Sequence, residues 1–148
     1  MNIIHEADMT LEKLLSVFLS RNVAAEIIGS YTGDSSPFLK VIYPDMLPII
    51  IWINQHVNCR AQLQMAATIL TRNEKKLCKE SRLQNMVSNL NGPGNFGAIY
   101  TESIHGVRVN GMLLFQDGIL EQTVLLSADY FANKATRIRE TLLSLQKS

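Results

Sequence analysis

Apolar positions near the start of the chain recur with the spacing of one helix face. A leucine-rich stripe falls at i, i+3, i+4 and i+7, formed by Leu11, Leu14, Leu15 and Phe18. Asp8 or Thr10 precedes the stripe as a candidate N-cap, because the side-chain oxygen of either residue can accept a hydrogen bond from a free backbone N–H of the first turn. The pattern predicts an amphipathic helix that ends near Asn22.

Strand-like patterning follows this helix up to residue 70. The run Ile49–Ile53 is apolar at every position, which predicts a central strand covered on both faces. From Gln62 to Leu70 apolar and polar residues alternate, which predicts a strand with one covered face that carries Leu63, Met65, Ala67 and Ile69. Clusters of turn-forming residues separate the strands. The predicted strands are Val23–Tyr31, Phe38–Tyr43, Pro48–Asn54 and Gln62–Leu70.

The second half of the chain is predicted to form a helix, then further strands, then a final helix. A polar segment from Thr71 leads into a helix whose apolar stripe is clear only from Leu83 to Leu90. Gln116–Gly118 predicts a hairpin turn between the last two strands, and Asn110–Gly111 offers a competing turn. Ser127 is the candidate N-cap of the last helix. The predicted strands are Phe96–Glu102, Val107–Phe115 and Ile119–Leu126, and the last helix is Ala128–Leu145.

Consecutive strands joined by short turns favour an antiparallel sheet with helices on one side, which is an α+β fold. Strands and helices do not alternate one by one, so a doubly wound α/β fold is not expected. We expect three helices in the order α-β(3-4)-α-β(2-3)-α. The 148 residues form a single domain, 1–148, with residues 1–8 frayed.

Composition and charge narrow the class of protein. A 47% hydrophobic share with 18% charged residues is typical of a globular chain, and a net charge of +1 argues against a dedicated nucleic-acid binder. No aromatic residues interleave with the basic groups on the predicted helices, as single-strand stacking would require. The N-terminus lacks a signal-peptide pattern, and the longest apolar run, Leu47–Ile53, is too short for a membrane span. We therefore expect a cytoplasmic protein with no membrane or nucleic-acid partner.

The segment Asn91–Gly97 contains a literal G-x-G-x-x-G string formed by Gly92, Gly94 and Gly97. In a dinucleotide-binding fold this string follows a strand and opens a helix, so that the helix N-terminus faces the phosphates. Here it follows a helix and precedes a strand, and a helix C-terminus disfavours phosphate. We interpret the segment as a helix stop and turn, in which Gly92 or Gly94 supplies a positive φ. Small-molecule or nucleotide binding by the Gly92–Gly97 loop is the alternative.

Candidate catalytic and metal-binding residues do not form a recognisable constellation. Cys59 and Cys78 fit no metal spacing, and His5, His56 and His105 form no i, i+4 pair on a helix. Cys59 lies near His56, but no third group or oxyanion hole accompanies them. We interpret Cys78 as an ordinary structural thiol, and the alternative is a redox sensor whose thiol pKa is lowered by the lysines beside it. We expect no enzyme activity, no cofactor and no metal.

Apolar surface is the remaining candidate for function. Trp52 lies in the most apolar strand, where it is either a core residue or an interface anchor. The strand Val107–Phe115 carries apolar residues on both faces, with Met112 and Leu114 opposite the others. Either helices lie on both sides of the sheet, or a partner covers the second face. The candidate protein interface is Trp52, Met112 and Leu114.

Three features together resemble the YbjN family of bacterial sensory transduction regulators, which share the fold of class I type III secretion chaperones. They are the leucine-rich first helix, a middle helix ending in Ser88-Asn89-Leu90-Asn91 before a strand, and a last strand that runs through Leu126–Phe131 into a long helix. The resemblance covers roughly residues 9 to 145. It implies a non-enzymatic cytoplasmic regulator or chaperone-like protein that binds another polypeptide and often forms a homodimer.

Overall fold

The computed structural model describes residues 2–29, 36–54, 61–92 and 98–146. Within these ranges the chain forms four α-helices, one short 3-10 helix and eight strands. In chain order these are β1 (Ile3–Ile4), η1 (Glu6–Asp8), α1 (Leu11–Ser20), β2 (Ala24–Ile28), β3 (Phe38–Ile42), β4 (Ile49–Asn54), β5 (Gln62–Thr71), α2 (Arg72–Lys76), α3 (Glu80–Leu90), β6 (Ala98–Ser103), β7 (Gly106–Leu114), β8 (Ile119–Leu120) and α4 (Glu121–Leu143).

Six of the strands form one antiparallel sheet in the order β2-β3-β4-β5-β7-β6. The first four follow one another along the chain, and β7 inserts between β5 and β6. The remaining strands, β1 and β8, pair with each other in a separate two-stranded sheet. The predicted α+β class with an antiparallel sheet is therefore confirmed.

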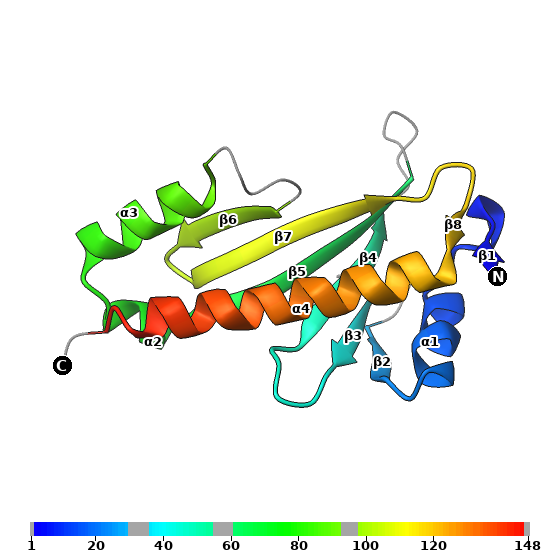
Figure 1. The fold of residues 1–148 in the computed structure, drawn as a ribbon, viewed down its shortest axis with the longest axis horizontal. Coiled ribbons are helices and arrows are strands. Elements are labelled where there is room, and N and C mark those ends of the chain that lie inside the picture. The colour runs from blue at the N-terminus through cyan, green and yellow to red at the C-terminus, as the bar shows by residue number, and fades with distance from the viewer. Residues whose placement is uncertain (1, 30–35, 55–60, 93–97, 147–148) are drawn as a thin grey trace.

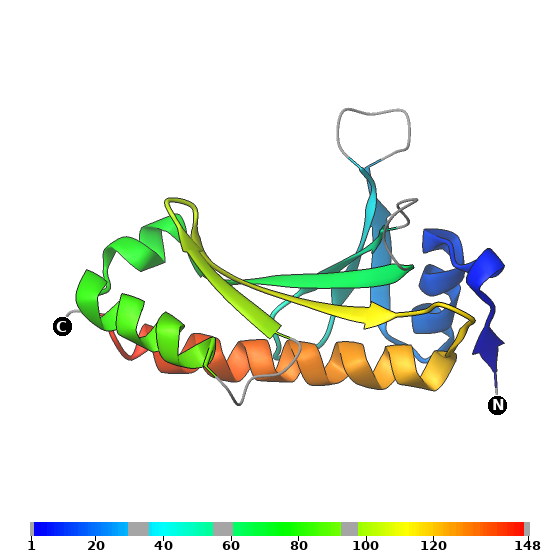
Figure 2. The same cartoon turned by 90° about the horizontal axis from the view of Figure 1, so that it is seen from above.

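The described helices leave one face of the large sheet uncovered. The long helix α4 runs along one face, and α1 packs beside β2 and β3 at one end (Figure 1). Helices α2 and α3 lie at the opposite end, beside the β6–β7 hairpin (Figure 1). Figure 2 shows the sheet as a curved layer with no described helix or strand over its other face. We call the face that carries α4 the inner face and the opposite one the outer face.

Strand β5 shows how alternation places the core on the inner face. Leu63, Met65, Ala67 and Ile69 are at most 4% exposed, as their period of two predicts. A register shift between Thr68 and Leu70 breaks the alternation, so that Leu70 is buried directly after Ile69. The α1 stripe supplies the facing layer, with Leu11, Leu14, Val17 and Phe18 buried in the same core. The predicted helix and its Thr10 cap are confirmed, since Thr10 Oγ1 accepts from the Lys13 N–H at 3.1 Å.

The predicted strand Ile119–Leu126 is wrong beyond its second residue, because α4 begins at Glu121. Val124, Ala128, Ala132 and Ala135 recur at helical spacing and are at most 2% exposed, so this face of α4 packs closely on the sheet. Ser127 consequently lies inside the helix and is not its N-cap. The small alanine side chains let a long helix approach the strands.

The predicted hairpin at Gln116–Gly118 is a turn, but it does not join neighbouring strands of the large sheet. Asp117 and Gly118 both have positive φ there, at 66° and 104°. The turn leads into β8, which pairs with β1 at the N-terminus. The first eight residues, expected to be frayed, thus contribute a strand in which Ile4 is 1% exposed. The alternative turn at Asn110–Gly111 lies inside β7.

The expectation of three helices is wrong, because the polar segment after Thr71 forms a helix of its own. Thr71 Oγ1 accepts from the Glu74 N–H at 3.3 Å, and the Glu74 carboxylate accepts from the Thr71 N–H at 2.9 Å. This reciprocal capping box starts the short helix α2 without any apolar stripe. A second start at Glu80 then gives α3.

Candidate functional site: the outer face of the sheet

The predicted interface residues lie together on the uncovered outer face. In the sheet register Trp52 of β4, Gln64 of β5 and Met112 of β7 are consecutive neighbours across the strands. Leu114 stands two residues further along β7, on the same face. Met112 is 53% exposed and Leu114 is 45% exposed. The face therefore presents large apolar side chains to solvent.

Strand β4 is not covered on both faces, so that prediction is wrong. Ile49 and Ile51 are at most 1% exposed on the inner face, whereas Ile50 and Trp52 on the outer face are only half-buried. Trp52 is therefore not part of the buried core. Apolar residues occupy both sides of β4 although the described helices cover only one, which is typical of a surface that meets a partner.

Two cations on this face were not identified from the sequence. Arg108 of β7 is exposed, and Lys40 of β3 is half-buried beside Ile50, its neighbour in the register. Both line a hollow of about 380 Å³, and Arg108 also lines an adjoining hollow of about 590 Å³ with Phe38 and Trp52. The alternation of β7 indicated that Arg108 shares a face with Met112. Only the strand order places it near β3 and β4.

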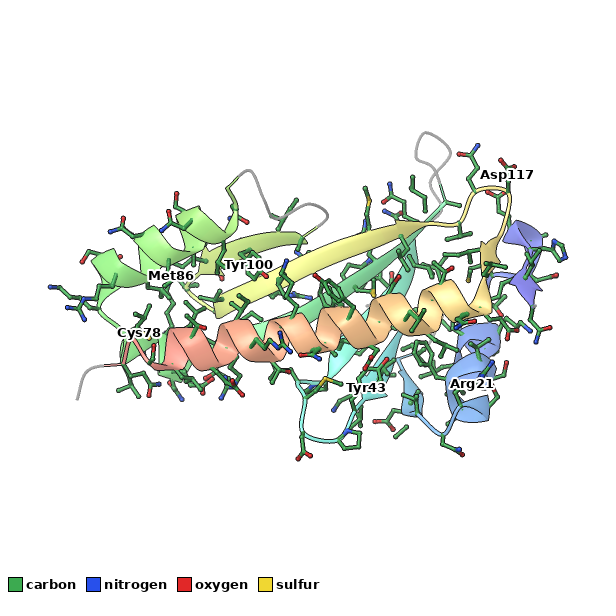
Figure 3. All side chains as sticks on the ribbon, viewed as in Figure 1. Arg21, Tyr43, Cys78, Met86, Tyr100 and Asp117 are labelled. Carbon is green, nitrogen blue, oxygen red and sulfur yellow. The ribbon has the colours of Figure 1, made fainter. Side chains whose placement is uncertain are left out.

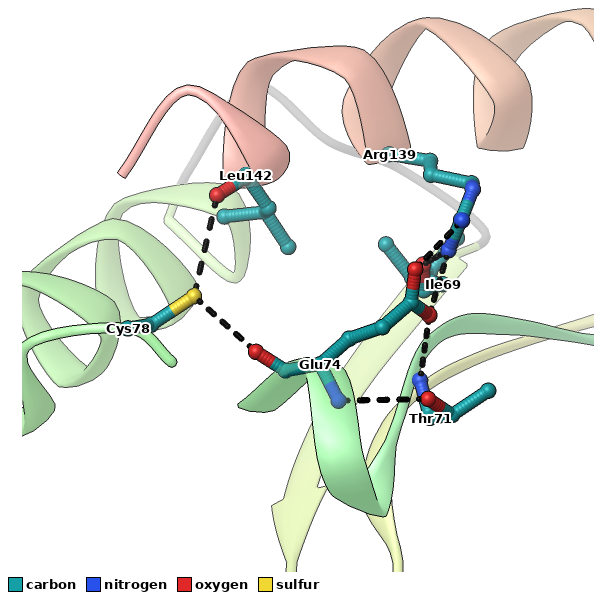
Figure 4. A network of polar contacts seen from close by, with 6 residues as sticks. All are labelled: Ile69, Thr71, Glu74, Cys78, Arg139 and Leu142. Carbon is teal, nitrogen blue, oxygen red and sulfur yellow. Dashed lines mark hydrogen bonds and ion pairs between the residues drawn. The ribbon is translucent and has the colours of Figure 1, made fainter. Parts of the chain in front are cut away.

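A charged network at one end of the outer face joins α2 to α4 (Figure 4). The Arg139 guanidinium donates to the Glu74 carboxylate, with Nη1 at 2.8 Å from Oε1, and to the Ile69 carbonyl at 2.9 Å. The hydrogen bonds from Arg139 to the carboxylate are the largest cause that lowers the pKa of Glu74 to about 2, and the bond from the Thr71 N–H adds to it. A two-pronged Arg–carboxylate pair of this kind fixes the relative placement of the two helices.

The Glu74 pair predicts a specific loss of stability in acid. Because the folded pKa is about 2 and the unfolded value is 4.5, the pair's contribution is fully present above pH 4.5 and is lost as pH falls towards 2. We expect this contribution to be about 1–3 kcal/mol. Urea denaturation at several pH values should show that Glu74→Gln is less stable at neutral pH and loses this acid dependence. Glu140→Gln, an exposed control on α4, should keep it. Equal acid profiles for the two variants would contradict the network.

Cys78 lies where α2, α3 and the end of α4 meet (Figure 3). Its side chain is 6% exposed, and its Sγ lies 3.6 Å from the Glu74 carbonyl oxygen and 3.9 Å from the Leu142 carbonyl oxygen. Burial, together with the nearby Glu74 charge, raises the pKa of the Cys78 thiol. The alternative of a thiol pKa lowered by the neighbouring lysines is therefore wrong, since burial outweighs them. The geometry supports the interpretation of Cys78 as an ordinary structural thiol.

The other candidate chemical groups are dispersed or lie outside the described residues. His56 and Cys59 fall in the segment 55–60, which is outside them. His5 precedes η1 and His105 lies in the β6–β7 turn, far apart in the fold (Figure 1). Among the residues that the structure describes, no three His, Cys, Asp or Glu side chains gather as metal ligands would.

The glycine-rich segment begins as predicted, directly after a helix. Helix α3 ends at Leu90 and strand β6 starts at Ala98. Gly92 donates its N–H to the Asn89 carbonyl at 3.1 Å and does not have a positive φ, so of the two candidates for that conformation only Gly94 remains. Residues 93–97, including Gly94 and Gly97, lie outside the described residues. A helix C-terminus therefore leads into the segment, which disfavours phosphate binding.

No protein-family model matches this chain, and no curated protein is similar enough to count as a match. No helix built from the described residues has the length and apolar character needed to cross a bilayer.

Proposed function

We propose that this protein is a non-enzymatic interaction module, a regulator or chaperone-like protein that binds another polypeptide through the outer face of its sheet. The observation that carries the proposal is the apolar outer face, on which Trp52, Met112 and Leu114 lie together without a covering helix among the described residues. Exposed apolar surface of this kind typically marks an interaction site. The resemblance to YbjN proteins and type III secretion chaperones supports the same function, in the cytoplasm.

We also propose that the protein acts as a homodimer. A second apolar surface lies on α4, where Leu126 is 60% exposed and Tyr130 is 68% exposed. Together with Met112 these side chains line a groove of about 350 Å³ between α4 and the strands β6 and β7, so this surface adjoins the outer face. Light scattering of the purified protein tests the dimer, and a monomer that persists at high micromolar concentration would contradict it.

Partner binding is expected to depend on Met112. Met112→Lys places a charge on the outer face and should weaken binding of the native partner at least about tenfold, because a lysine buried under a partner must lose its hydration. Partners captured from the native cell by the wild-type protein and by the variant are identified by mass spectrometry and compared quantitatively. Leu19→Lys is the matched control, since Leu19 is 51% exposed on α1, away from this face. Partners lost equally in both variants, or in neither, would argue against the outer face.

A further inference from the structure

The outer face is hollowed into a continuous trough. One hollow of about 590 Å³ is lined by Phe38 and Trp52, and the adjoining hollow of about 380 Å³ is lined by Lys40 and Thr68. Ile50 and Arg108 line both hollows, so the two form one surface that crosses β3, β4, β5 and β7. We call these six residues the trough. It is wide enough for the side chains of a polypeptide segment, and Phe38, Ile50 and Trp52 form its apolar part.

The charges in the trough are not balanced. Arg108 and Lys40 make no ion pair among the described residues. A third cation at the end of the trough, Arg139, is already bonded to Glu74. Glu26 faces Lys40 across the β2–β3 pair, but it also makes no ion pair within the described residues. A guanidinium beside apolar side chains therefore remains available for an external anion.

The positive trough argues against a second copy of this chain as its occupant. A two-fold contact between outer faces would bring the Arg108 and Lys40 side chains of both copies into one desolvated interface, where like charges are destabilising. A carboxylate offers the opposite complementarity, because the planar guanidinium of arginine binds it through two parallel hydrogen bonds. Nucleic acid is less suited, because its repeating phosphates require more free cations than the two in the trough.

We propose that the trough binds a polypeptide segment in which an Asp or Glu stands among apolar side chains. The carboxylate is bound by Arg108 with support from Lys40, and the apolar side chains pack on Phe38, Ile50 and Trp52. This inference rests on the proposed function, since it names the partner class of the same face. A ligand of this kind would contact both the apolar side chains and the two cations of the trough.

The test uses a random-sequence peptide library displayed on phage and selected on the full chain. The selected peptides should be enriched in Asp or Glu flanked by aliphatic or aromatic residues. Synthetic copies labelled with fluorescein should bind Arg108→Glu at least about tenfold more weakly than wild type. Replacing the selected acidic residue with lysine should abolish binding to wild type and restore binding to Arg108→Glu. Arg137→Glu, an exposed charge reversal on α4, is the matched control and should bind like wild type. Circular dichroism confirms that each variant is folded.

Each other outcome overturns a defined part of the proposal. Selected peptides that lack acidic residues and ignore Arg108→Glu, yet fail to bind Met112→Lys, would refute the acidic partner and leave the proposed function intact. If no selected peptide loses binding when the outer face is substituted, the result would count against both the acidic partner and the proposed function. Tighter binding of a labelled single-stranded DNA, lost in Arg108→Glu, would replace the polypeptide with a nucleic acid. Self-association that Arg108→Glu strengthens would assign the trough to a second copy.

Discussion

Replacement of Gly106 by alanine is expected to destabilise the protein by at least about 3 kcal/mol. Gly106 opens β7 with φ of 124°, a conformation that residues with a side chain rarely adopt. A β-carbon at this position would overlap the Leu70 carbonyl oxygen and lie 3.0 Å from the Thr71 carbonyl carbon. Because both obstacles are backbone atoms, β5 and β7 would have to separate where α2 begins.

Gly111→Ala is the matched control for this substitution. Gly111 lies in the middle of the same strand and does not have a positive φ. We expect its replacement to change the free energy of unfolding by no more than about 1 kcal/mol. Urea denaturation of the two variants and the wild type measures the difference. Equal stabilities for Gly106→Ala and Gly111→Ala would refute the close approach of β7 to the Leu70 carbonyl.

Replacement of Phe115 by alanine is expected to cost about 3–5 kcal/mol, because it leaves a cavity in the core. Phe115 follows β7, is 0% exposed, and donates its N–H to the Ala61 carbonyl at 3.1 Å. Met112→Ala, three residues earlier on the opposite face, should change stability by no more than about 0.5 kcal/mol. Thermal or urea denaturation tests the pair.

Comparing the stabilities of Met112→Ala and Phe115→Ala shows whether the outer-face side chain is needed for folding or only for binding. If Met112→Ala proved as destabilising as Phe115→Ala, the outer face would be part of the core, and its apolar residues would need no partner. If Met112→Ala is neutral, the outer-face side chains contribute little to folding. A large apolar side chain that folding does not require is best explained by binding.

Local periodicity was sufficient to predict most of the sheet. The alternation in β7 placed Met112 and Leu114 on one face, and Trp52 was proposed separately from its position in the most apolar strand. The strand order then shows that the three residues share a surface. The spacing of Leu11, Leu14 and Phe18 likewise predicted α1, because a helix stripe of this kind has few alternatives.

The sequence-based assignment of helices was wrong at two places, the start of α4 and the short helix α2. The segment from Ile119 to Leu126 is apolar enough to read as a strand, but the Val124, Ala128 and Ala132 positions continue the stripe of α4 towards its start. Alanines are weak markers of a buried face, so the helix was predicted too short. The capping box formed by Thr71 and Glu74 was a readable signal for α2, although no apolar stripe supported it.

The trough could not be predicted from sequence, because it depends on pairing between distant strands. Arg108 lines the same hollow as Ile50 and Lys40 only because β7 lies beside β5, and β5 lies beside β4. A long-range partner such as Arg139 for Glu74, 65 residues away, leaves no local pattern. The sequence therefore identified three apolar residues of the outer face, whereas only the strand order shows that Arg108 and Lys40 lie on the same face.

The side chain of Asn91 limits how this protein can assemble. Its amide nitrogen donates to the Tyr100 carbonyl oxygen and its amide oxygen accepts from the Tyr100 N–H, both at 2.7 Å, as a neighbouring strand would. An exposed edge strand with free backbone groups invites filament growth by strand addition. At β6 such addition would first have to displace Asn91. The outer face can therefore remain accessible to a partner, while Asn91 hinders a second molecule from adding a strand at the β6 edge.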